Sequence, residues 1–222
     1  MNLYHCADRA VLRVRNAAAS FLKAYTTNIA TAARAAFVDL QGRIVAVADQ
    51  HYLSENEILL VVRKPFRERL LTHLEKYLRL GDTVIEEEPG WKVYFSSEGR
   101  SASGGDIVIR QKKGALLLSH EEKQAVMSEE EFTRFRVLNG LPLQGIDFDR
   151  ELILNVSEEF VSFDKGCYLG QEIVARVQYR AKPPRKLVVK SETECSAEER
   201  AHMTSRVPLD GKVSGFVFVG HI

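Results

Sequence analysis

Two β-rich runs follow each other directly across a short turn in the first quarter of the chain. The first ends at Leu40, the turn is Gln41-Gly42, and the second run extends from Ile44 to Val47. Two such runs around a glycine predict a β-hairpin. Ser54 to Glu57 predicts a second turn, which leads into a buried strand from Ile58 to Arg63. Adjacent strands favour an α+β fold with antiparallel sheets over a regular βαβ winding.

Three helices are predicted, one before these strands and two after them. Helix formers run from Ala17 to Tyr25, and Asn16 is placed to cap them, since its side-chain oxygen can accept a free backbone N–H. Leucines recur at helical spacing after Pro65, and Gly81 ends that run. A Ser-x-x-Glu capping box at Ser128 opens a third helix.

Patterns in the rest of the sequence predict further strands and one linker. The strands are expected over Thr83 to Ile85, Trp91 to Phe95, Asp106 to Arg110, Lys186 to Lys190 and Val213 to Val219. Small polar residues predict a loop over 96–105. The double proline Pro183-Pro184 predicts a linker, because proline cannot donate to a ladder and restricts the residue before it. We therefore expect one region over 1–182 and a short C-terminal β segment over 183–222.

Composition excludes several classes of protein. Lysine plus arginine number 31 against 30 acidic residues, which gives a formal net charge of +1 and argues against a nucleic-acid partner. No apolar run approaches the roughly 20 residues that cross a bilayer, and the first residues lack the apolar core of a signal peptide. The three cysteines form no C-x-x-C pair and sit at no zinc-ligand spacing. We expect a reduced, cytoplasmic protein that uses neither a membrane nor a structural metal.

Residues 165–172 bring several residue types that can bind or react close together, in the sequence Lys-Gly-Cys-Tyr-Leu-Gly-Gln-Glu. The two glycines predict a tight, exposed loop. From Gln171 onward the pattern fits a short helix or a strand. If it is a helix, Cys167 precedes its N-terminus with Lys165 close by, and both features favour the thiolate. On the residues alone Cys167 is either such a thiolate or a small buried side chain, and Tyr168 either stacks on a ligand ring or packs in the core.

The same segment resembles the signature of the YgfZ-type family, which is related to the aminomethyltransferase (T-protein) of the glycine cleavage system. Three further stretches are similar to family patterns: Phe21-Leu22 to Thr27-Asn28, Asp39-Leu-Gln-Gly-Arg43, and Arg136-x-x-x-Gly140-x-Pro142-x-x-Gly145-x-Asp147. The resemblance implies a T-protein-like folate-binding fold with a reduced C-terminal β-barrel-like segment. It also implies an accessory role in assembling or repairing iron–sulfur clusters, with iron–sulfur proteins or cluster carriers as partners.

Site residues follow from the resemblance. Cys167 is the functional thiol and Lys165 its supporting cation. Tetrahydrofolate or a related folate is the implied cofactor, and its binding residues are Arg136, Tyr168, Gln171, Glu172 and Arg176. A single thiolate is far short of the four ligands that hold a cluster permanently, so we expect transient ligation or thiol exchange.

Two departures from the T-protein pattern bear on the reaction. Leu138 stands where the family carries the glutamate that binds the pterin ring, so we expect impaired folate binding. The stretch from Arg43 to Val47 has no carboxylate, which removes the proton-handling group of aminomethyl transfer. The alternative function is a tetrahydrofolate-dependent, aminomethyltransferase-like enzyme that uses Asp49 or Asp147, and a third is a binding module that has lost both chemistries.

Overall fold

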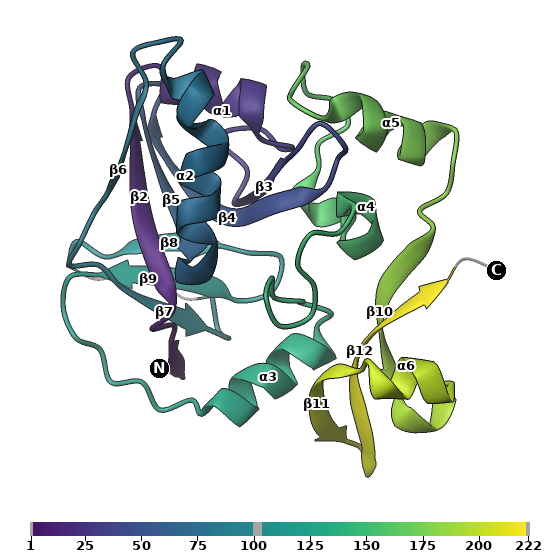
Figure 1. The fold of residues 1–222 in the computed structure, drawn as a ribbon. Helices are drawn as coiled ribbons and strands as arrows, with labels where there is room; N and C mark the ends of the chain where they lie inside the picture. Colours follow the sequence, from purple (N-terminus) through teal and green to yellow (C-terminus); the bar gives the residue numbers. More distant parts are fainter. Residues whose placement is uncertain (1, 100–103, 221–222) are drawn as a thin grey trace.

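Three antiparallel sheets and six α-helices make up the described part of the chain (Figure 1). The computed structural model describes residues 2–99 and 104–220 of the 222. Strand pairs within the three sheets all run antiparallel. The expected α+β class is confirmed.

The first sheet has five strands in the order β3-β4-β5-β2-β6. Their bounds are β2 Arg9–Arg15, β3 Arg34–Val38, β4 Ile44–Ser54, β5 Glu57–Arg63 and β6 Val84–Glu87. β3 and β4 form the predicted hairpin. β5 lies in the middle of the sheet with both faces covered, which explains its continuous apolar run from Ile58 to Val62.

Two helices cover one face of this sheet: α1 (Ala18–Tyr25) and α2 (Lys64–Leu78) (Figure 1). Leu70 and Leu74 of α2 are fully buried against the sheet, as their helical spacing predicted. The predicted cap of α1 is wrong. Asn16 has φ 61°, and its Nδ2 donates to the carbonyl of Asp82 at 3.0 Å instead. The first turn of α1 donates to the turn after β4, where Glu55 supplies a carbonyl to Ala19 at 2.9 Å.

The other face of the first sheet packs on the second sheet, whose order is β1-β7-β9-β8. Its strands are β1 Leu3–His5, β7 Lys92–Ser96, β8 Ile107–Arg110 and β9 Ala115–Ser119. Helix α3 (Glu129–Leu138) follows and begins with the predicted capping box at Ser128 and Glu131. Part of the predicted loop, residues 100–103, lies outside the described residues.

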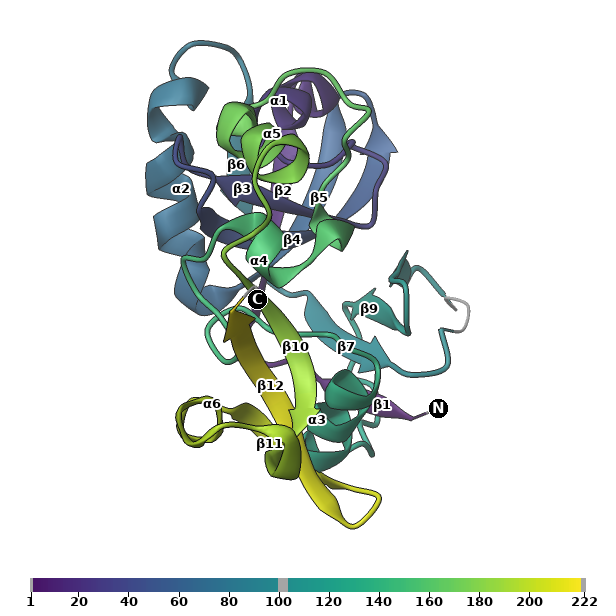
Figure 2. The same cartoon turned by 90° about the vertical axis from the view of Figure 1, so that its right-hand side faces the viewer.

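The last third of the chain contributes four short helical elements, one longer helix and the third sheet (Figure 2). The helical elements are α4 Ile153–Val156, η1 Glu158–Phe160, α5 Gln171–Tyr179, η2 Glu192–Glu194 and α6 Ala197–Ala201. The sheet has the order β10-β12-β11, with β10 Arg185–Ser191, β11 Thr204–Leu209 and β12 Lys212–Gly220. Residues after Gln171 thus form a helix, which resolves the earlier ambiguity. β10 begins directly after the double proline, while the division into two regions stays a prediction.

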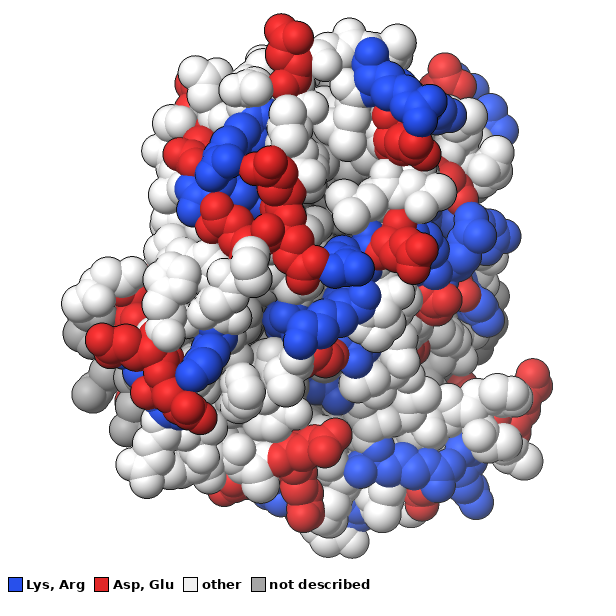
Figure 3. Space-filling view, turned by 60° about the vertical axis from the view of Figure 1, so that its left-hand side comes forward, with Lys and Arg blue, Asp and Glu red and all other residues white. Residues whose placement is uncertain are grey.

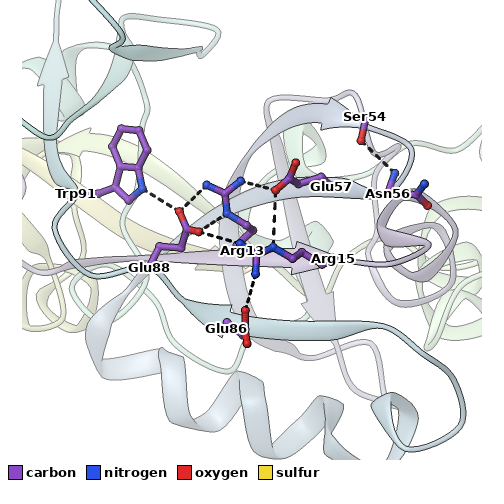
Figure 4. A network of polar contacts seen from close by, with 8 residues as sticks. All are labelled: Arg13, Arg15, Ser54, Asn56, Glu57, Glu86, Glu88 and Trp91. Atoms are coloured by element: carbon purple, nitrogen blue, oxygen red, sulfur yellow. Dashed lines mark hydrogen bonds and ion pairs between the residues drawn. The ribbon is translucent and has the colours of Figure 1, made fainter.

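Opposite charges alternate on the surface. Acidic and basic side chains lie beside one another on the face drawn in Figure 3. In the network of Figure 4, Arg13 of β2 contacts Glu57 and Glu88, and Trp91 Nε1 donates to Glu88 at 3.2 Å. Arg15 Nη1 lies 2.8 Å from Glu86 in the same network. These pairs join β2 to Glu57 of β5, to Glu86 of β6 and to Glu88, which directly follows β6.

Two kinds of feature are missing from residues 2–99 and 104–220. No helix there has the length and apolar character that a membrane crossing requires. Histidine, cysteine and carboxylate side chains form no group of three that could hold a metal ion within the same residues.

Candidate functional site around Cys167

Cys167 lies on the segment between η1 and α5, residues 161–170, which we call the Cys167 loop. Its side chain is exposed, whereas Cys6 and Cys195 are buried. Helix α5 begins at Gln171 with Gly170 as its N-cap, so Cys167 stands three residues before the cap. The side chain of Cys167 is thus exposed, and it lies before the N-terminus of the helix, as the sequence predicted.

Lys165 anchors the Cys167 loop to the end of α1. The side chain is buried, and its Nζ donates to the carbonyls of Thr26 at 2.6 Å and Asn28 at 2.8 Å. Burial, helped by the nearby charge of Lys23, lowers the pKa of Lys165 from 10.5 to about 8. This amine differs from the expected supporting cation, because its donors are directed at two backbone oxygens in the segment that follows α1.

Further hydrogen bonds join the same two segments. Thr27 Oγ1 donates to the carbonyl of Phe160 at 2.5 Å, and Asn28 Nδ2 donates to that of Glu159 at 3.3 Å. In the other direction, the backbone N–H of Ser162 donates to Thr27 at 2.9 Å. The N–H of Leu169 likewise donates to the carbonyl of Ala24 at 2.9 Å. The Thr27-Asn28 pair, singled out by resemblance, thus holds one end of the Cys167 loop.

Gly170 closes the other end against the β3–β4 turn. It has φ +80°, and a Cβ at this position would lie 2.3 Å from the carbonyl oxygen of Asp39. Gly42 of the same turn has φ +71°, and a Cβ placed on it would lie 3.2 Å from Ile173 of α5. The contact at Gly170 excludes a Cβ, and the positive φ of both residues favours glycine. The hairpin motif and the signature segment, far apart in sequence, are therefore one packing unit.

Tyr168 packs in the core. It is buried in a cluster with Val38 and Val174, and burial raises its pKa to about 12. Lys165 Nζ lies 5.1 Å from the centre of the ring, over its face. The packing alternative is thus the one the structure supports, and the ring secures the residue next to Cys167.

Lys23, in the last turn of α1, is a residue that the sequence did not single out. Its side chain is exposed, and its Cε would lie 3.3 Å from a Cβ placed on Gly166, the neighbour of Cys167. A free cation beside the thiol loop therefore comes from α1. No local pattern in the sequence indicated that Lys23 lies beside this loop.

The remaining predicted site residues divide between two places. Glu172 and Arg176 are exposed and line an open groove on α5, and Gln171 Oε1 accepts the N–H of Tyr168 at 3.3 Å. Arg136 is buried on α3, and its Nη1 donates to Asp147 at 2.7 Å. The cavity that Arg136 lines and the groove of α5 are different features. Their roles in binding stay predictions.

The residues expected for a folate do not fit one another as a folate site. Leu138, at the place of the pterin-binding glutamate, is 59% exposed on α3 rather than directed into a cavity. Arg136 is already paired with Asp147, and Arg176 is exposed on another helix. A carboxylate can accept from the N–H donors of a pterin, and the carboxylate in the predicted set, Glu172, lines the groove of α5 rather than the cavity that Arg136 lines. We therefore derive no chemical step through folate.

The relatives of the chain are distant. No family model matches it. It is 25% identical over 191 residues to an uncharacterized protein of Haemophilus influenzae, covering 82% of this chain and 68% of that one. It is 27% identical over 136 residues to the tRNA-modifying protein YgfZ of Hamiltonella defensa, covering 58% of this chain. That second match spans 39% of the length of the relative.

Solved structures show the fold. The chain superposes with a TM-score of 0.73 on the crystal structure of the glycine cleavage system aminomethyltransferase T from Bartonella henselae. The superposition covers 99% of this chain and 78% of the other, at 12% sequence identity. At that identity the likeness concerns the arrangement of the chain and not its chemistry.

Proposed function

Because this chain is a distant homologue of YgfZ with the fold of aminomethyltransferase T, we propose that it serves iron–sulfur proteins through Cys167. The observation that carries the proposal is an exposed thiol on a loop whose flanks are buried and anchored. An exposed cysteine on a positioned loop can reach a metal centre in another protein, which a buried thiol cannot.

In this function Cys167 acts as one transient ligand. Iron–sulfur clusters are held by cysteine thiolates, commonly four. One thiolate from this chain leaves the other positions to the client or carrier that brings the cluster. Anchoring through Lys165 and Gly170 keeps the loop in one conformation, so binding does not have to order it.

The charge balance bears on how such a factor would contribute to tRNA modification, which the name of the relative mentions. The formal net charge is +1, and acidic and basic groups are interleaved on the face of Figure 3. RNA affinity depends on cations that neutralise phosphates. We propose an indirect contribution, through a protein partner that carries the cluster.

The alternative, a tetrahydrofolate-dependent transferase, requires a carboxylate that can take and release protons. Asp49 lies 3.0 Å from Arg34 Nε and accepts from Gln111 Nε2 at 2.7 Å. Asp147 forms an ion pair with Arg136. Both carboxylates are buried in ion pairs, so no observation favours the transferase. Titration with tetrahydrofolate separates the two functions, since micromolar binding with one-carbon turnover would support the enzyme.

A cysteine replacement tests the proposal. Cys167→Ser should abolish support of iron–sulfur enzyme activity in cells that lack the gene, with little change in melting temperature because the side chain is exposed. Cys195→Ser, at a buried cysteine between η2 and α6 that packs against the third sheet, is the matched control and should keep activity. Full activity of Cys167→Ser would remove the thiol from the function.

Alkylation provides a measurement on the purified protein. In the folded state iodoacetamide should modify Cys167 and spare Cys6 and Cys195, which react only after unfolding. Mass spectrometry of the digested protein reads the three sites separately. Equal protection of all three would contradict the accessible loop on which the proposal rests.

A further inference from the structure

Arg9, the first residue of β2, carries a buried guanidinium that has no carboxylate oxygen within hydrogen-bond distance in the described part of the chain. Its side chain is 8% exposed. The nearest carboxylate oxygens belong to Asp8 and Asp49, at 3.8 and 3.9 Å, beyond hydrogen-bond distance. Within residues 2–99 and 104–220 its Nε is buried and has no hydrogen-bond partner. A guanidinium stays charged in proteins, and a buried charge of this kind is costly unless an anion pairs with it.

The groups around this guanidinium cannot serve as that anion. Asp8 pairs with Arg63 Nε at 2.5 Å, and Asp49 pairs with Arg34 Nε at 3.0 Å. Cys6 also lies beside Arg9, and burial raises the pKa of its thiol to about 12, so the thiol is neutral. The two carboxylates nearest Arg9 are therefore each paired more closely with another arginine.

A cavity of about 280 Å³ lies beside Arg9, between β1, the start of β2 and α3. One wall is the stack of Tyr4 on Phe132, with ring centres 4.2 Å apart, and Leu143 and Ile146 add aliphatic surface. Arg9 also borders a smaller, neighbouring space together with Arg34 and Arg136. All three of these arginines are more than nine-tenths buried. Within the described residues the Nε atoms of Arg9 and Arg136 have no hydrogen-bond partner, whereas Arg34 Nε lies 3.0 Å from Asp49.

We propose that this cavity binds a small organic carboxylate whose charge is paired with Arg9. The planar guanidinium matches a carboxylate in two parallel hydrogen bonds, and the aromatic and aliphatic walls suit the apolar part of an organic acid. Asp8 and Glu129 also line the cavity, and their charge disfavours phosphate and other multiply charged anions. The site does not include Cys167, so its test is independent of the test of the proposed function.

Calorimetric titration of the full chain tests the site with three probes: benzoate, its neutral isostere benzamide, and inorganic phosphate. Benzoate should bind, and benzamide and phosphate should bind much more weakly. Arg9→Gln should weaken benzoate binding by roughly tenfold or more, because the probe loses its charge partner. Arg67→Gln, at a surface arginine that pairs with Glu87, is the matched control and should bind benzoate normally.

Specific results would overturn the site. Equal benzoate affinity in Arg9→Gln and the wild type would show that Arg9 does not hold the ligand, and equal affinity for benzamide would show that charge is irrelevant. Phosphate binding that survives Arg9→Gln, without benzoate binding, would indicate a surface anion site instead. If Arg9→Gln does not fold, Ile146→Trp fills the cavity while keeping the charge, and undiminished benzoate binding in that variant would also refute the proposal. Cys167 alkylation should stay unchanged in every variant.

Discussion

Replacing Lys165 by methionine should remove a pH dependence from the stability of the folded chain. The pKa of Lys165 falls from 10.5 to about 8 on folding, chiefly through burial. Between these two values the folded state binds fewer protons than the unfolded state. The free energy of unfolding therefore rises as the pH increases above about 8, and the contribution is absent at lower pH, where both states are protonated.

The magnitude follows from the size of the pKa change. Each unit of pKa difference corresponds to about 1.4 kcal/mol in the free energy of unfolding. Between about pH 7 and pH 9 the free energy of unfolding of the wild type should rise by on the order of 1 kcal/mol. Deprotonation does not sacrifice the anchoring, because a neutral amine still has two N–H donors for the carbonyls of Thr26 and Asn28. Methionine leaves both carbonyls without this donor, at a cost of about 1–3 kcal/mol for each buried acceptor at any pH.

Urea denaturation of the wild type and Lys165→Met at several pH values checks the reasoning. The variant should be less stable throughout, and the gap should widen by on the order of 1 kcal/mol from about pH 7 to pH 9. The raised pKa of Cys6 lowers the stability of both proteins as pH rises, so it cancels in the difference. A gap that stays constant over this range would mean that burial does not disfavour the ammonium, and the argument for Lys165 would fail.

Three further variants test the surroundings of the site. Asp147→Asn leaves its buried arginine partner unpaired and should cost about 3–5 kcal/mol in urea denaturation; a loss below 1 kcal/mol would contradict a buried ion pair. Gly170→Ala should cost more than Gly211→Ala, because both have positive φ but only the first would place a Cβ against a carbonyl oxygen; equal losses would show that the contact is not tight. Glu88→Gln should flatten the acid dependence of stability: the hydrogen bond from Arg13 lowers the pKa of Glu88, and the stability this provides is lost as pH falls through the folded value. If Glu88→Gln loses stability at acidic pH in the same way as the wild type, the assignment to Glu88 is refuted.

Elements with strong local signals were predictable from sequence. The β3–β4 hairpin, β5, α2 and the capping box of α3 all match, since each depends on residues within one turn or one strand. β9 was missed as a strand. Its run from Ala115 to Leu118 is buried throughout, so it lacks the alternation that identifies a half-exposed strand. The cap at Asn16 failed because a turn from another strand supplies the acceptors for α1.

The candidate site was predictable only in part. A glycine-rich segment correctly indicated an exposed loop at Cys167. The partners of Lys165 lie more than a hundred residues earlier in the chain, so no local pattern could assign them. Arg9 is a stronger case. Its sequence context is an ordinary alternating strand, and its missing partner becomes apparent only when β1, β2 and α3 come together.

The family-like motifs have a structural explanation that does not involve one-carbon transfer. Thr27-Asn28 holds one end of the Cys167 loop, and the β3–β4 turn receives Gly170 at the other end. Both motifs therefore support the position of one exposed thiol. The T-protein pattern lost from this chain, the glutamate replaced by Leu138, lies on a different helix and contributes nothing to that support. An exposed thiol on a loop that is anchored at both ends is what we expect if the thiol carries the function.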